Sequence, residues 1–297
     1  MSSISRQVVD ELIDDERVLD RVKVELYLPV SLGLRHCAIV ELPASLPNGL
    51  ELAKQVDESC RDDYQLVLEE PDPAKKWPLI EALKNNLQKG FEEKVMSSQS
   101  CLALAYWENK LGLRRYIVAL RPTIREIYLY RSVGDWWTIR RLVQNRLSLR
   151  KQAIRNPKYR EIAAFPEEFV PEYLRSTGQL LGYPDCCVET YVQDRVGNTV
   201  AEIRLSNQLH STRDQGNVLE PYSFFARDFY PCQPGCREAE KNGLRLLQTL
   251  KDLDKRLGDT YQKCLEQNMA YVENYGAYVA QHIADFNQRL RETGSLL

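Results

Sequence analysis

Four of the eight cysteines lie in two short motifs, GYPDCC at residues 182–187 and FYPCQPGC at residues 229–236. An amphipathic helical pattern follows each motif directly, so we expect both cysteine groups at the start of a helix. Free backbone N–H groups and the positive end of the helix dipole stabilise thiolates there. Four thiolates match the ligand set of a tetrahedral zinc site or an iron–sulfur cluster. The predicted metal ligands are Cys186, Cys187, Cys232 and Cys236.

The spacing within the two motifs bears on the kind of metal. Cys232 and Cys236 have three residues between them, as a chelating pair can, but Cys186 and Cys187 are adjacent. Adjacent side chains of a helix diverge by about 100°, so both reach one ion only if the backbone before them is non-helical. A multi-iron cluster accepts ligands that are further apart. The sequence therefore favours an iron–sulfur cluster, with zinc as the alternative cofactor and four buried, metal-free cysteines as the third interpretation.

The remaining cysteines have no such context. They do not have proline and glycine beside them as the two motifs do. An unpaired cysteine is ordinarily a small, buried core residue. We expect that role for Cys37, Cys60, Cys101 and Cys264.

Several polar residues near the motifs are candidates for chemistry. Tyr230 and Asp185 are predicted to transfer protons beside the cluster, and Arg227 and Arg237 are predicted to bind an anionic substrate. His210 is a further candidate ligand or general acid, although it lies in a polar run typical of an exposed loop. Capping and solvated ion pairs are the alternative roles of the charged residues.

The GYP-x-CC and PC-x-x-x-C pair resembles an uncharacterised prokaryotic, largely archaeal family, known as a domain of unknown function, in which two such motifs recur at a similar separation. The resemblance covers roughly residues 180–240. It implies that the four cysteines act together, and it implies no reaction. Members of that family have a histidine just before the PC, where this chain has Phe229 and Tyr230.

Composition limits the class of protein. Hydrophobic residues make up 43% of the 297 residues and charged residues 28%, as in ordinary folded proteins. We find no secretory signal and no apolar run of about 20 residues, so we expect a cytoplasmic protein without a membrane partner, in which thiols stay reduced. Walker A, GxGxxG, HExxH and GxSxG motifs are absent from the sequence.

Hydrophobic patterning predicts an α+β fold with a mixed sheet-and-helix domain at 1–121 and a mainly helical domain with the cysteine-rich site at 122–297. The expected strands are 22–28, 37–42, 64–68, 101–107 and 115–120, with a hairpin turn at 109–112. The expected helices are 50–60, 78–95, 135–154, 236–258 and a last helix that ends near residue 291. Gly258 and Asp259 are expected to separate the last two helices, which should form an antiparallel pair.

The charge is unevenly distributed. Residues 110–160 contain fourteen basic residues and two acidic ones, a local charge of +12, while the whole chain has a net charge of −2. Arginine and aromatic residues together bind phosphates and stack on bases, so this segment is a candidate RNA surface. It can equally form ion pairs with the acidic remainder of the chain.

The sequence thus favours an enzyme with an iron–sulfur centre that performs redox or sulfur-transfer chemistry on a small anionic substrate or a redox partner. The first alternative is a zinc-stabilised RNA-binding protein that uses residues 110–160. The second is a redox enzyme with a metal-free dithiol.

Overall fold

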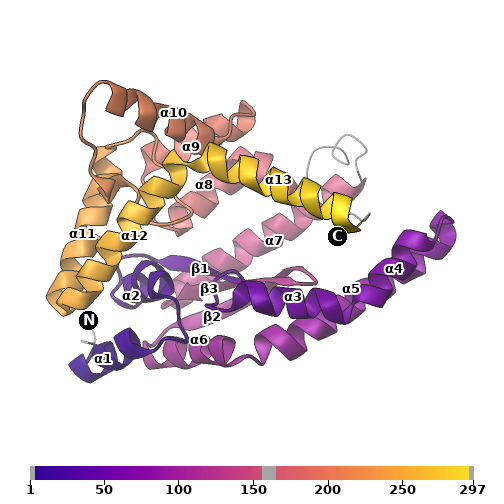
Figure 1. Ribbon diagram of the computed structural model, residues 1–297. Helices are drawn as coiled ribbons and strands as arrows, with labels where there is room; N and C mark the ends of the chain where they lie inside the picture. The colour runs from indigo at the N-terminus through magenta and orange to yellow at the C-terminus, as the bar shows by residue number, and fades with distance from the viewer. Residues whose placement is uncertain (1–3, 156–164, 294–297) are drawn as a thin grey trace. The chain divides into compact units, whose positions relative to one another are not determined.

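The computed structural model in Figure 1 describes residues 4–155 and 165–293. As predicted, the fold is α+β, with a small antiparallel sheet and a mainly helical C-terminal part. The chain divides into two compact units, Met1–Arg140 and Arg141–Leu297. The domain boundary between residues 121 and 122 stays a prediction, and those two residues lie where β2 turns toward β3. None of the described helices is long and apolar enough to cross a membrane.

The sheet of the first unit has three strands, β1 (Cys37–Leu42), β2 (Arg114–Arg121) and β3 (Ile124–Tyr130), in the order β1-β3-β2. The strands predicted at 37–42 and 115–120 are therefore confirmed. The central strand β3 lies in a region where we expected helices, and this expectation is wrong. Its residues 127–129 are almost fully buried between two antiparallel partners.

Helices make up most of the rest of the first unit, and those predicted at 50–60 and 78–95 are confirmed. Its α-helices are α1 (Arg6–Asp14), α2 (Leu28–Ser31), α3 (Gly49–Ser59), α4 (Arg61–Glu69), α5 (Pro73–Phe91) and α6 (Gln99–Lys110). Two π-helical segments, Val22–Tyr27 and Glu92–Met96, continue into or out of these helices. The predicted helix at 135–154 is α7 (Val133–Arg155), which spans the division between the units.

Three predicted strands are helical instead. Residues 22–28 are π-helical and enter α2, residues 64–68 lie in α4, and residues 101–107 lie in α6. Short apolar runs fit a strand or a buried helix equally well, and in the third case the Ser98 hydroxyl caps the helix by accepting the Cys101 N–H at 3.2 Å. The predicted hairpin at 109–112 is consequently wrong. Gly112, with φ +67°, ends α6 there, and the hairpin joins β2 to β3.

The described part of the second unit contains the helices α8 (Pro171–Leu180), α9 (Asp185–Val196), α10 (Ala201–Asp214), α11 (Arg237–Leu253), α12 (Lys255–Glu273) and α13 (Tyr275–Thr293). Two short 3₁₀ turns, Pro166–Phe169 and Pro221–Ser223, precede α8 and α11. The expected pairing of the helices near the C-terminus is confirmed, because α11 and α12 lie side by side (Figure 1).

The break between that pair differs from the prediction. Asp254, not Asp259, caps α12, since its carboxylate accepts the Arg256 N–H at 2.7 Å. Gly258 lies inside α12. The last predicted helix is also divided, because the chain changes direction at Asn274 between α12 and α13 (Figure 1).

Candidate metal centre

The four cysteines of the two motifs meet in space. Their sulfur atoms all lie within 4.8 Å of one another. The Cys186 Sγ atom is 3.8 Å from that of Cys187 and 3.7 Å from that of Cys236, and the latter two are 3.6 Å apart. The arrangement is therefore a compact four-sulfur group that can bind a metal ion.

The N-terminal ends of two helices position three of these thiols, as the sequence predicts. Pro184 has an extended backbone (φ −59°, ψ 136°), and α9 begins at the next residue, so Cys186 and Cys187 lie in its first turn. Cys236 is the N-cap of α11 and follows Gly235, which has φ +72°. Cys232 lies in the loop before that helix, and its N–H is 3.4 Å from the Cys187 Sγ atom.

The condition under which adjacent cysteines reach one centre is met in part, because the backbone is non-helical at Pro184 although Asp185 already lies in α9. Cys186 and Cys187 both lie in α9, yet both sulfur atoms approach Cys236. Adjacent Cα atoms are only about 3.8 Å apart, and rotation about χ1 can direct two neighbouring Sγ atoms toward one point. Neighbouring positions in the first helical turn can thus serve one centre.

The surroundings affect the ionisation of the thiols differently. Burial raises the pKa of Cys187 far above its usual value and that of Cys232 to about 11. Burial also opposes ionisation of Cys236, but the Ala239 N–H and the neighbouring thiols outweigh it and lower the pKa of Cys236. A coordinated metal cation deprotonates a cysteine thiol. The four cysteines therefore provide the donor atoms of a thiolate site, and binding of a cation would ionise them.

A half-buried arginine that the sequence analysis missed, Arg204, holds the Cys232 loop. Arg204 of α10 donates to both carboxylate oxygens of Asp194, at 2.8 and 3.0 Å. It also donates to the Cys232 carbonyl at 2.8 Å and to the Pro231 carbonyl at 3.3 Å. Its one local partner is Gln208, at 3.1 Å. The partners that tie it to the loop and to α9 are ten and 27 or 28 residues away, so its helical sequence context does not distinguish it.

The residues predicted to transfer protons lie in different environments. Tyr230 is half-buried, and burial and the Glu202 carboxylate raise its pKa far above the usual value. Its ring is parallel to that of Tyr191, with centroids 6.3 Å apart. Asp185 is exposed as the first residue of α9. Their roles in catalysis stay predictions.

The predicted substrate-binding arginines lie on different elements. Arg237 is exposed at the start of α11, next to Cys236. Arg227 lies 3.5 Å above the ring centroid of Tyr271 and lines a pocket beside α12 and α13. His210 is exposed near the end of α10, so the loop expected there is wrong, and it is not part of the four-sulfur group.

The other four cysteines are buried, as predicted for core residues. Cys37 lies in β1, Cys101 in α6 and Cys264 in α12, and Cys60 lies between α3 and α4. Burial raises the pKa of Cys37 to about 12 and that of Cys101 to about 11.

Part of the basic segment forms internal ion pairs. Arg125 is buried and lies 3.0 Å from Glu92, and Arg150 and Arg146 both approach the buried Glu167. Residues 156–160 of the segment lie outside the described residues. The RNA surface stays a prediction.

Comparison with known proteins identifies one family. A family model described as "Protein of unknown function (DUF483)" matches residues 114–262, which include all four cysteines of the centre. The match agrees with the expectation of an uncharacterised family, whose motifs and archaeal distribution stay predictions. No curated protein and no solved structure matches the chain.

Proposed function

The chain belongs to the DUF483 family of proteins of unknown function, and on that premise we propose that its four-cysteine centre binds a single zinc ion that stabilises the second unit. The ion would connect the first turn of α9 to the loop at 229–236 and to the start of α11. These segments are about 50 residues apart in the sequence.

One observation carries this proposal, namely the distances between the sulfur atoms. A zinc ion bound tetrahedrally by four thiolates at about 2.3 Å holds them about 3.8 Å from one another. Three of the thiols are 3.6 to 3.8 Å apart before any ion is considered. The group therefore has the size of a single-ion site.

An iron–sulfur cluster, which the sequence favours, fits these distances less well. Its cysteines bind different iron atoms, and their sulfur atoms are consequently further apart than the ligands of one ion. Four protein ligands also leave no open position for substrate, which is the pattern of a structural zinc site. Redox or sulfur-transfer chemistry, with Tyr230 and Asp185 as proton donors and Arg237 as a substrate ligand, would follow instead if a cluster were found.

A metal-free dithiol is the weaker alternative. Thiolates are the nucleophiles in thiol exchange, and burial raises the pKa of Cys187 and Cys232. Two of the four thiols are thus poor nucleophiles without a cation. A zinc–thiolate centre also agrees with the cytoplasmic location that we propose, where thiols stay reduced.

Metal and acid-labile sulfide analysis of protein purified without oxygen tests the proposal. We expect one zinc ion per chain, no sulfide and no visible absorption. Iron with sulfide and broad visible absorption would overturn the single-ion site in favour of a cluster. One iron ion without sulfide would overturn zinc as the metal.

A pair of variants assigns the metal to this group. Cys236→Ser should lose the zinc, because the remaining thiols cannot complete the tetrahedron. Cys264→Ala is the matched control, since Cys264 is buried in the same unit but lies outside the group. It should retain full zinc content. Full zinc content in Cys236→Ser would contradict the proposal.

RNA binding by the basic segment is a second candidate function. The observation that favours it is a cluster at the start of α7, in which Arg140 and Trp137 are exposed and Trp136 is half-buried. The Arg140 guanidinium lies 5.4 Å from the Trp136 ring and 5.6 Å from the Trp137 ring. Stacking of bases on Trp137, which is 57% exposed, would be the expected mode. Loss of RNA binding in Trp137→Ala tests it.

A further inference from the structure

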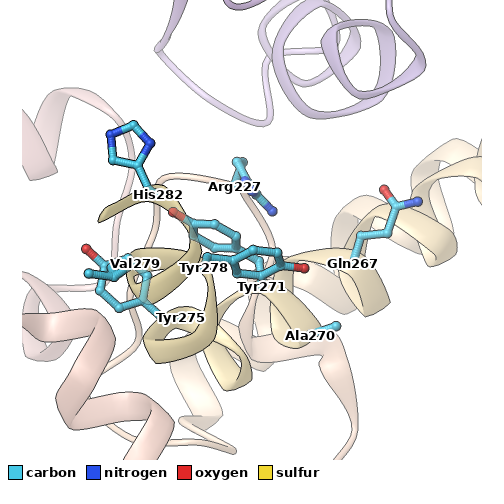
Figure 2. Close-up of a pocket in the computed structure, with 8 residues that line it drawn as sticks. All are labelled: Arg227, Gln267, Ala270, Tyr271, Tyr275, Tyr278, Val279 and His282. Carbon is cyan, nitrogen blue, oxygen red and sulfur yellow. The ribbon is translucent and has the colours of Figure 1, made fainter. Parts of the chain in front are cut away.

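A pocket of about 730 Å³ lies beside α12 and α13 (Figure 2). This volume is within the range of small-molecule sites. Among the described residues, those that line it include one arginine and one histidine but no aspartate or glutamate. The lining residues are Arg227, Gln267, Ala270, Tyr271, Tyr275, Tyr278, Val279 and His282.

One face of each of two helices provides most of this lining. Positions 267 and 271 are four residues apart on α12, and positions 275, 278 and 282 follow at spacings of three and four on α13, so each set lies on one side of its own helix. Figure 2 shows Gln267 and His282 at opposite ends of the row, with the tyrosine rings between them. The spacing of these residues is visible in the sequence. Whether they form a binding site depends on the side chains that lie opposite them.

The tyrosines already take part in stacking. The Tyr271 and Tyr278 rings are nearly parallel, at 25°, with centroids 5.5 Å apart, and Tyr278 is 54% exposed. The Arg227 guanidinium lies 3.5 Å from the Tyr271 ring centroid. Such stacking uses the face of the guanidinium, whereas its N–H donors lie in its plane.

The loop that carries Arg227 is held against α12. The Tyr261 hydroxyl donates to the Phe225 carbonyl at 2.9 Å, and the Asn268 amide donates to the Phe224 carbonyl at 3.1 Å. Both side chains are buried. Arg227 is therefore fixed beside the tyrosine row by contacts that do not involve the pocket itself.

We propose that this pocket binds a nucleotide, with the base stacked on the exposed tyrosine ring and the phosphate bound by Arg227 and His282. Aromatic rings stack on any base, and arginine binds phosphate through two parallel N–H donors. The lining described by the structure has this combination, and it includes no carboxylate that would repel an anion. A free nucleotide and one nucleotide of a single RNA strand share this chemistry.

Binding of small ligands to the full chain tests the proposal. By calorimetry, at least one of the four nucleoside 5′-monophosphates should bind more than tenfold tighter than its nucleoside or inorganic phosphate. Arg227→Gln should abolish the preference for the nucleotide over the nucleoside. Tyr278→Ala should weaken the binding of the nucleotide and of the nucleoside by about tenfold each, the usual effect of removing one stacking ring.

Ile283→Ala is the matched control, because Ile283 is 53% exposed on the same helix and does not line the pocket. It should bind as the wild type does. Zinc content measured on every variant separates loss of the pocket from loss of the metal centre, on which this proposal does not depend. An RNA octamer that binds more tightly than the monophosphates, and loses affinity in Arg227→Gln, would identify an RNA strand as the source. Equal affinity would identify the free nucleotide.

Two results would overturn the proposal. The first is that neither the monophosphates nor the octamer bind. The second is that they bind equally to wild type, Arg227→Gln and Tyr278→Ala, which would place any nucleotide site elsewhere on the chain.

Discussion

Arg204→Met is the substitution that best tests how the metal centre is positioned. Arg204 joins a carboxylate of α9 to the carbonyls of the Cys232 loop, and no other ion pair between described residues has this link to the centre. Its side chain is 17% exposed and that of Asp194 only 7%. The substitution therefore leaves a buried carboxylate without its cation and two carbonyls without these donors.

The burial sets the expected magnitude. Removing one partner of a buried pair costs about 3 to 5 kcal/mol of unfolding free energy, because the other charge stays buried. Replacing both partners, as in Arg204→Met with Asp194→Leu, should recover most of that loss. It should not restore the loop contacts. We therefore expect the double variant to bind zinc about 10- to 100-fold more weakly than wild type, as for other losses of support around a metal site.

Urea unfolding at a fixed excess of zinc measures the first quantity, and competition with a chromogenic chelator measures the second. Arg175→Met is the matched control. Arg175 also pairs with a residue of α9, Glu189, at 2.6 and 2.9 Å, but both side chains are more than 40% exposed. Exposed pairs contribute little, so the unfolding midpoint and zinc affinity of Arg175→Met should match those of wild type.

If Arg204→Met loses less than about 1 kcal/mol of unfolding free energy, which is the range of an exposed pair, Arg204 does not form a buried pair that supports the centre. Wild-type zinc affinity in the double variant would also contradict the reasoning, because Cys232 would then be positioned without Arg204.

Three further predictions concern other parts of the chain. Burial raises the pKa of Glu108 from 4.5 to about 7, so its contribution to stability is present below pH 4.5 and is lost as the pH rises through 7. Glu108→Gln should remove this loss. In urea unfolding, its free energy of unfolding relative to wild type should rise by up to about 3 kcal/mol between those pH values. Gly178→Ala should cost about 1 to 3 kcal/mol, because the new Cβ would lie 2.5 Å from Val188. Gly276→Ala, with nothing within 4 Å and a helical backbone in α13, should leave the thermal midpoint unchanged or slightly raised. Chelation should lower the midpoint of the wild type, with recovery on adding zinc but not magnesium; an unchanged midpoint would contradict a structural ion.

The helix starts at the cysteine motifs could be predicted because their cause is local. Pro184 and the turn at Gly235 fix the backbone within one or two residues of the cysteines. That the motifs meet was predicted from the thiols' chemistry and the family resemblance. Local sequence did not indicate it, since α10 and a long loop separate the motifs. The preference for a cluster came from helix geometry alone, whereas the Cys186 and Cys187 sulfur atoms lie 3.8 Å apart and both approach Cys236.

The errors in the first unit have a different origin. Residues 101–107 form a short, continuous apolar run that fits a strand, but the cap at Ser98 precedes them and α6 forms. Strand β3 was missed because its burial depends on two partners, one of them about 90 residues earlier in the chain. A short apolar run does not specify its own environment, so such segments need tertiary contacts to be assigned.

Both proposed sites depend on one loop, residues 224–236, which has neither helix nor strand. A loop lacks the regular backbone hydrogen bonds of a helix or sheet, so buried carbonyls in it need side-chain donors. Asn268 and Tyr261 supply them at one end and Arg204 near the other. Polar side chains are costly to bury unless they are paired. Polar side chains at these positions therefore serve to hold Arg227 and Cys232 in place. An apolar side chain could not replace them, because it cannot donate a hydrogen bond to a backbone carbonyl.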